Sequence, residues 1–326
     1  MFHFSPRNAL LPSAALAIML GLTACGGGGS SDPAPAEPAA TTPPATTPPA
    51  TTPPATTPPP TTPGPISITG LTDFRSTAPN NLVNFAAATP NTVVMKAITG
   101  LTAGDTVVGI DVRPSNGTMY AFARADAGGA PTGPASIYVI NPDTGAATGR
   151  VLVSGVTFDV STSVSVDFNP AADRMRVVTF LGQSVSVDVT TGVGTVNGAI
   201  AGTGFAAAVA YTNSAVSTTA PASTVLYRID NQGAPDDLTT VTPGTGAIAT
   251  TVGPIGLDLV EVQAFDIGGA TNQNALAALR TTATGAHSLY RINLTTGKAT
   301  LFNASAALSL IGGTAGVPLV DIAIRP

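Results

Sequence analysis

Short apolar stretches recur along the chain after residue 108 and resemble one another. We interpret each stretch as a strand that is apolar on both faces, as expected where a strand is packed between neighbouring sheets. Aligned on their third position, the stretches recur after 56, 44, 55 and 57 residues, and this position holds Asp111, Asp167, Tyr211, Asp266 and Ala323. A period near 50 residues with strand-like content is typical of a β-propeller, in which each repeat forms one blade.

Two further signals keep step with these strands. A second apolar strand follows each of the first four, beginning at Met119, Arg174, Val225 and Ala275. A turn signal comes next, in which Asn, Asp or Pro precedes a closing glycine that takes a positive φ. These glycines are 47, 54 and 51 residues apart: Gly145, Gly192, Gly246 and Gly297. Because strand and turn repeats advance together, we predict four-stranded blades.

The fifth blade requires both ends of the repeat region. The chain ends on an inner strand at residues 321–326, while residues 82–85 and 93–98 have the pattern of outer strands with no inner strand before them. Joining these segments would close the ring and remove exposed strand edges. We therefore predict an all-β, five-bladed propeller that is closed by pairing its C-terminal strand with N-terminal strands.

Residues 1–24 have the pattern of a lipoprotein signal peptide. Arg7 supplies a positive charge, and residues 9–22 form an apolar stretch too short to span a bilayer. The sequence ending in Ala24-Cys25 resembles the bacterial lipobox, in which the cysteine is acylated. Cys25 is the only cysteine of the chain, so we expect it to be lipidated and to attach the protein to a membrane. The alternative is an ordinary secretory signal with a chance cysteine.

A linker and one folded domain are predicted beyond the signal peptide. Residues 25–65 contain a Gly/Ser-rich start and an Ala-Thr-Thr-Pro-Pro repeat, which cannot bury a core and favours polyproline II conformation. We expect a disordered tether, which acts either as a spacer from the membrane or as a linker without further function. Residues 66–326 have a length that suits a single all-β domain.

Several motifs of residues 66–326 resemble an uncharacterised bacterial family. They are Gly109-Ile110-Asp111-Val112-Arg113-Pro114, Asp167-Phe168-Asn169-Pro170 with Asp173-Arg174-Met175-Arg176-Val177-Val178, and Leu289-Tyr290-Arg291-Ile292 with Thr296-Gly297. The family is one of the "domain of unknown function" families found in exported, propeller-like proteins. The resemblance implies a propeller in one domain, and it carries over no catalytic residue.

Charge and composition exclude one class of partner. The chain has 13 Lys and Arg against 18 Asp and Glu, a net charge of −5, and no basic cluster. Nucleic-acid binding needs a stripe of basic side chains, so we expect no nucleic-acid partner. An envelope protein or glycan is the partner class that an exported, anchored domain would meet, and we expect the protein to be a monomer.

No recognisable catalytic set occurs in the sequence. His287 is the one histidine after the signal peptide, no Gly-x-Ser-x-Gly motif accompanies it, and we expect it to be a solvated residue at a strand edge. No Cys/His cluster suggests zinc. Turn residues such as Asn141, Asp143 and Asp188 carry oxygen ligands suited to Ca²⁺, although turn formation by itself explains them.

Two groups of charged residues remain as candidate sites. Asp111, Asp167 and Asp266 share one position of three inner strands, so a closed ring would bring three carboxylates toward one axis. There they could bind a hard cation or raise one another's pKa. The competing interpretation is that each caps the backbone of a neighbouring strand or pairs with Arg113, Arg174 or Arg325.

The second group is Asp173, Arg174 and Arg176, which follow an Asn-Pro turn. The two guanidinium groups could bind an anion. The competing interpretation is a turn that its own side chains stabilise.

From these features we expect a lipid-anchored protein of the bacterial envelope that is a binding or interaction module rather than an enzyme. Gly26 after the lipidated cysteine favours the outer membrane, by resemblance to lipoprotein sorting in some bacteria. Two alternatives stay open: an envelope hydrolase or lyase that uses the channel carboxylates, and a purely structural envelope protein.

Overall fold

The computed structural model describes residues 64–326 except 75–79, 128–129, 162, 201–205, 231–235, 243, 246, 261–263 and 282–285. The predicted signal peptide, Cys25 and residues 26–63 of the linker lie outside the described residues, as does Gly246 of the third turn signal. Within the described ranges, no helix has the length and apolar character needed to cross a bilayer.

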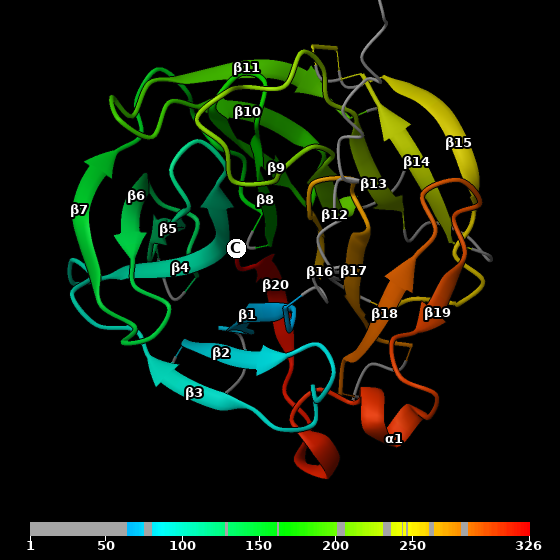
Figure 1. Cartoon of the computed structure of the whole chain (residues 1–326). Coiled ribbons are helices and arrows are strands. Elements are labelled where there is room, and N and C mark those ends of the chain that lie inside the picture. The colour runs from blue at the N-terminus through cyan, green and yellow to red at the C-terminus, as the bar shows by residue number, and fades with distance from the viewer. Residues whose placement is uncertain are drawn as a thin grey trace, which may run out of the picture. The chain divides into compact units, whose positions relative to one another are not determined.

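Five four-stranded antiparallel sheets form a ring, which confirms the predicted five-bladed propeller (Figure 1). Blade 1 contains β20 (Leu319–Ile324), β1 (Ser67–Thr72), β2 (Asn81–Ala86) and β3 (Val94–Ala97). Blade 2 contains β4 (Asp105–Arg113), β5 (Thr118–Ala125), β6 (Ala135–Ile140) and β7 (Ala147–Leu152). Blade 3 contains β8 (Val164–Asn169), β9 (Arg174–Thr179), β10 (Gln183–Val187) and β11 (Gly194–Ala199).

The last two blades follow the same order from the inside outward. Blade 4 contains β12 (Ala206–Tyr211), β13 (Leu226–Asp230), β14 (Asp237–Val241) and β15 (Ile248–Pro254). Blade 5 contains β16 (Ala264–Gly268), β17 (Asn274–Leu279), β18 (Ser288–Ile292) and β19 (Ala299–Leu301). A single helical turn, α1 (Ala306–Ser309), and a 3-10 turn, η1 (Gly313–Ala315), precede β20.

Ring closure joins the two ends of the domain. β20 pairs antiparallel with β1, with Ile68 opposite Ile324 and Gly70 opposite Ile322, and Figure 1 shows both strands at the inner side of blade 1. The predicted joining of the C-terminal strand to residues 82–85 and 93–98 is confirmed, and β1 lies between β20 and β2 in the shared sheet. One C-terminal and three N-terminal strands thus share one sheet, and β1 inside it is almost wholly buried.

The core lies between neighbouring blades rather than inside any one of them. Leu82 of blade 1 packs in one cluster with Ile110 and Tyr138 of blade 2. Phe122 of blade 2 packs in another cluster with Phe168 of blade 3. Burying one such side chain stabilises the fold by about 1.5–3 kcal/mol. These apolar contacts hold neighbouring blades together, although their sheets share no strand pairing.

The predicted turns connect the third and fourth strands, and they also bind the preceding blade. The carbonyl of Gly145 accepts from the Thr99 N–H (3.0 Å), and the Thr99 carbonyl accepts from the Ala147 N–H (2.8 Å). Gly192 and Ser154 repeat this bridge between blades 2 and 3. Gly145 has φ +78°, and an added Cβ would lie 2.1 Å from the Ala97 carbonyl oxygen. Glycine is thus needed both for its φ and for close approach of the neighbouring backbone.

We expect Gly145→Ala to lower the free energy of unfolding by about 2–5 kcal/mol, because left-handed strain and a backbone clash add together. Gly104→Ala is the matched control: its φ is +88°, but nothing lies within 4 Å of the added Cβ. That variant should lose only about 1 kcal/mol. Urea unfolding of both variants measures the difference, and equal losses would contradict an inter-blade role for the turn.

Candidate functional site

Three inner strands bring Asp111, Asp167 and Asp266 together at the centre of the ring. One carboxylate oxygen of each lies within 4.8 Å of the others, and all three side chains are buried. β4, β8 and β16 supply them from three different blades. The convergence follows from the repeat, since equivalent positions of inner strands face the common axis.

Each carboxylate is held by the backbone of the next inner strand. Asp111 Oδ2 accepts from the Phe168 N–H (2.6 Å), Asp167 Oδ1 from the Tyr211 N–H (3.1 Å), and Asp266 Oδ2 from the Ile324 N–H (2.6 Å); the donors lie on β8, β12 and β20. This is the backbone-capping interpretation of the sequence analysis. Its other part, pairing with arginine, is wrong for these carboxylates, because Arg113, Arg174 and Arg325 pair with Asp173, Asp188 and Asp143.

A fourth carboxylate was missed in the sequence. Asp321 on β20 is fully buried, and its Oδ2 accepts from the Ile110 N–H of β4 (2.9 Å). In the same way, the Ser165 hydroxyl on β8 accepts from the Val209 N–H of β12 (3.0 Å). Asp321 lies two residues before Ala323, and alternate residues of a strand share a face, so the period of two could have found it.

The fourth inner strand departs from the predicted alignment by one residue. The N–H that meets Asp167 belongs to Tyr211, whereas in the neighbouring blade the N–H that meets Asp111 belongs to Phe168, the residue after Asp167. Ala210, not Tyr211, therefore occupies the carboxylate position of β12. The alanine side chain cannot accept a hydrogen bond, and the Asn213 N–H instead donates to Asn272 Oδ1 (2.6 Å), which links blades 4 and 5 through their turns.

Burial governs the protonation of the cluster. It raises the pKa of Asp266 from the ordinary 3.8 to about 6, because the charged form loses its hydration. Burial, together with the nearby Asp266 carboxylate, also raises the pKa of Asp111 well above its usual range. The pKa values of Asp167 and Asp321 are raised by burial first and by neighbouring carboxylates second.

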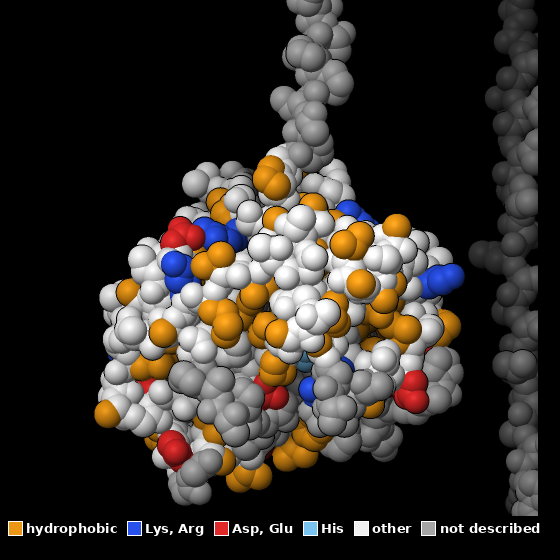
Figure 2. Space-filling model, turned by 90° about the horizontal axis from the view of Figure 1, so that it is seen from below, with side chains coloured by type: hydrophobic (Ala, Val, Ile, Leu, Met, Phe, Trp, Pro, Cys, Tyr) orange, Lys and Arg blue, Asp and Glu red, His pale blue; other side chains and the backbone are white. Residues whose placement is uncertain are grey.

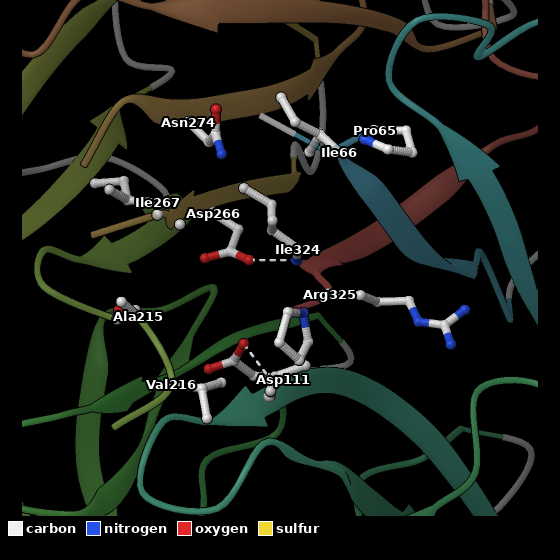
Figure 3. A pocket seen from close by; sticks show the side chains of 16 residues that line it. Pro65, Ile66, Asp111, Ala215, Val216, Asp266, Ile267, Asn274, Ile324 and Arg325 are labelled. Carbon is white, nitrogen blue, oxygen red and sulfur yellow. Dashed lines mark hydrogen bonds between the residues drawn. The ribbon is translucent and has the colours of Figure 1, made fainter. Parts of the chain in front are cut away.

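A cavity of about 370 Å³ opens onto two of these carboxylates (Figure 3). Asp111 and Asp266 line it together with the polar side chains of Asn274 and Arg325. Val216, Ile267 and Ile324 contribute apolar surface. Asp167 lies in the cluster but is not part of the cavity lining. The cavity can therefore present carboxylate oxygens and apolar groups to one small ligand.

The side chains of the second candidate group contact separate partners. Asp173 pairs with the Arg113 guanidinium of blade 2, whose Nε lies 2.8 Å from Asp173 Oδ1, and Arg174 lies 3.7 Å from Asp188. Arg176 is buried and donates to the Tyr211 hydroxyl (3.1 Å). The three side chains thus bind three different partners, while Asn169 Oδ1 accepts from two turn N–H groups, as expected of a self-stabilised turn.

The remaining polar candidates also have structural partners. Asn141 and Asp188 each accept from two backbone N–H groups of their own turns at 2.9 and 3.1 Å. The prediction of a solvated His287 is wrong: the side chain is 1% exposed, and its Nδ1 accepts from the Leu319 N–H (3.1 Å). The segment before β20 covers this strand edge, since the Ile311 N–H donates to the His287 carbonyl.

Charged side chains are sparse on the face of the molecule that Figure 2 shows. Figure 2 shows Lys and Arg side chains scattered among apolar and uncharged ones on the face in view.

Residues 81–315 match the family described as a domain of unknown function (DUF4394). The chain belongs to this family. No curated protein matches the chain.

Two solved structures resemble the DUF4394 chain in part. The Dos1 propeller is 12% identical over 71% of this chain and 56% of its own length, with a TM-score of 0.35. An exo-β-1,3-galactanase from Phanerochaete chrysosporium is 10% identical over 72% of this chain and 66% of its own, with a TM-score of 0.38. In both comparisons the chain spans less than two thirds of the other protein.

We expect the protein to become less stable as the pH rises from about 4 to about 8. Raised carboxyl pKa values mean that the folded state binds protons more tightly than the unfolded state, so the penalty appears above the ordinary pKa and grows until the folded pKa, about 6 for Asp266, is passed. Asp266→Asn keeps an oxygen acceptor without the charge. It should raise the melting temperature at pH 7.5 and flatten its fall with pH.

Asp173→Asn is a control with the opposite expected effect, because the pKa of Asp173 is lowered rather than raised. The Arg113 guanidinium lowers the pKa of Asp173, so this carboxylate contributes stability above the ordinary pKa, and that stability is lost as the pH falls. The variant should melt at a lower temperature than the wild type at pH 7.5. A wild-type melting temperature that climbs between pH 5 and pH 8 would contradict the assignment of raised pKa values to the channel.

Proposed function

We propose that this protein is a lipid-anchored binding module of the bacterial envelope that holds a positively charged group of its ligand in the central cavity. The observation that carries the proposal is the cavity lined by the carboxylates of Asp111 and Asp266. Both are buried, and neither has an ion-pair partner among the described side chains. Arg325, the basic residue of the lining, pairs with Asp143, so a cationic group of the ligand would supply the counter-charge of these two carboxylates.

The electrostatics favour such a ligand at neutral pH. Buried carboxylates with raised pKa values are unstable as anions, and an opposite charge within about 4–6 Å favours the charged form. Binding of a cation therefore competes with protons and should strengthen as the pH rises. A hard cation such as Ca²⁺ and a primary ammonium group both satisfy this chemistry, since each interacts favourably with carboxylate oxygens.

The cavity walls favour an organic ammonium over a bare ion. Val216, Ile267 and Ile324 offer apolar surface next to the carboxylates, and Asn274 adds an amide that can donate and accept. Amino sugars of envelope glycans and lysine side chains of envelope proteins both carry an ammonium group next to apolar C–H groups. We propose this class of partner for a monomeric domain held near an outer membrane through acylated Cys25 and its Pro/Thr-rich linker.

Thermal-shift measurements with glucosamine, N-acetylglucosamine and CaCl₂ at pH 7.5 test this proposal. A ligand at 100 times its Kd stabilises the native state by about 2.7 kcal/mol. Glucosamine should raise the melting temperature, and N-acetylglucosamine, which lacks the charge, should not. Asp266→Asn should reduce the glucosamine shift, whereas Asp173→Asn should leave it unchanged. Equal shifts with both sugars, or none with glucosamine and CaCl₂, would overturn the cation-binding proposal.

One observation favours a hydrolase or lyase as the second candidate function. A carboxyl group with a pKa of about 6 beside other carboxylates is suited to general acid–base catalysis near neutral pH. If the cavity is catalytic, Asp111→Asn and Asp266→Asn should each abolish turnover of envelope sugars or lactones while the protein remains folded. A structural envelope protein would show neither turnover nor a ligand shift.

A further inference from the structure

One connection of the ring differs from the others in length. Between the first and second strands, blades 2, 3 and 5 use residues 114–117, 170–173 and 269–273, whereas blade 4 uses residues 212–225. Four, four and five residues thus correspond to fourteen in blade 4. Connections longer than about 12 residues without their own secondary structure are uncommon in compact domains, and they are often lids or binding loops. We call residues 212–225 the strap.

The strap reaches across the ring to a blade that is not its neighbour. It leaves β12 of blade 4, and its Ser217 N–H donates to the Pro114 carbonyl of blade 2 (2.9 Å). Val216 lies against the Gly117 turn of the same blade, 3.5 Å from the position of an added Cβ. The strap therefore extends from blade 4 past the turn of blade 3 and contacts blade 2.

This position makes the strap one wall of the central cavity. Ser214, Ala215 and Val216 line the cavity together with Asp111 and Asp266, and Figure 3 shows Ala215 and Val216 beside these two carboxylates. The other lining residues come from the inner strands, the residues that follow β16 and β20, Asn274 at the start of β17 and the segment before β1. Movement of the strap would therefore open the cavity without disturbing any blade.

The strap is held weakly on the side away from the cavity. A second cavity of about 360 Å³ lies along it, between residues 217–221 and the turn residues Pro170 and Asp173 of blade 3. Residues 216–220 are all exposed. Beyond its base at Asn213, the described contacts of the strap with blade 2 are one backbone hydrogen bond and the packing of Val216. Few buried contacts and open space on two sides are properties of segments that open at low free-energy cost.

We propose that the strap is a movable wall that admits the ligand to the central cavity and whose residues 214–216 determine which ligands fit. The inference rests on the proposed function of the cavity as a binding site. Opening breaks the Ser217–Pro114 hydrogen bond, and closing places Val216 against the ligand. Lids of this kind exclude water from the site and thereby strengthen the attraction between a bound cation and carboxylates.

A thiol-labelling experiment tests this inference without knowledge of the ligand. In the full chain carrying Cys25→Ser, the substitution Asn274→Cys places a single thiol in the cavity lining, which we call the cavity thiol. In a second chain, Thr250→Cys on the exposed outer strand β15 gives a freely accessible reference thiol. The rate of labelling is measured with a cationic reagent, 2-aminoethyl methanethiosulfonate, and an anionic reagent, 2-sulfonatoethyl methanethiosulfonate.

Ser217→Pro removes the N–H that anchors the strap, and Ser217→Ala is the matched control, because it keeps this N–H and loses only the hydroxyl. One lost hydrogen bond corresponds to about 1 kcal/mol, or about a fivefold shift of the opening equilibrium. Labelling of the cavity thiol with both reagents should therefore be about fivefold faster in Ser217→Pro than in Ser217→Ala. Labelling of the reference thiol should be equal in the two backgrounds.

Equal rates for the cavity thiol in the two backgrounds would overturn the inference. Labelling of the cavity thiol in Ser217→Ala as fast as that of the reference thiol would also overturn it. If Ser217→Pro does not fold, Asn213→Gly replaces it: glycine suits φ +64°, and the change removes the acceptor of Asn272 Nδ2 and the donor to the Ser223 carbonyl. Faster labelling of the cavity thiol would again support the inference, and an unchanged labelling rate would contradict the proposal that the strap is a movable wall.

The charge of the reagents separates this inference from the proposed function. A strap that gates access changes the rates of both reagents by the same factor. A cavity that attracts cations makes the ratio of the cationic to the anionic labelling rate higher at the cavity thiol than at the reference thiol, whatever the strap does. Gating without charge preference would overturn the cation proposal alone, and charge preference without gating would overturn the strap alone.

Discussion

Inner strands of a propeller have one edge that no strand can pair, and this constraint shapes the centre of the molecule. Each inner strand pairs with another strand only on its outer side, within its own sheet, so the N–H groups on the inner edges need acceptors from elsewhere. The neighbouring blade supplies them: Asp321 for Ile110, Asp111 for Phe168, Asp167 for Tyr211 and Asp266 for Ile324. Carboxylates bridge four of the five junctions around the axis in this way.

This solution creates the electrostatic character of the site. Carboxylates satisfy the strand edges, but they converge on one axis, where burial disfavours their charge and raises their pKa values. The groups that hold the ring together are therefore also the groups that a cation would stabilise. The cation binding that we propose would therefore also relieve the repulsion between these carboxylates.

Blade 4 differs from the other blades in two ways: its inner strand lacks the carboxylate, and the connection to its second strand is long. Ala210 replaces the carboxylate, and the link to blade 5 moves outward to the turns, where Asn213 and Asn272 exchange hydrogen bonds. The same blade carries the long strap between β12 and β13, which crosses to Pro114 of blade 2. The long strap thus makes the ring of similar blades asymmetric. It also gives the central cavity one wall that belongs to no β-sheet.

Local patterns were enough to predict the number of blades, the positions of the turns and the use of both chain ends in one sheet, because strand and turn signals repeat with one period. They also placed Asp111, Asp167 and Asp266 at equivalent positions. Four features emerged only in the folded chain: β1 lies between β20 and β2, His287 is buried, Ala210 rather than Tyr211 faces the axis, and the strap spans two blades. These features depend on contacts between residues far apart in the chain, which local patterns do not encode.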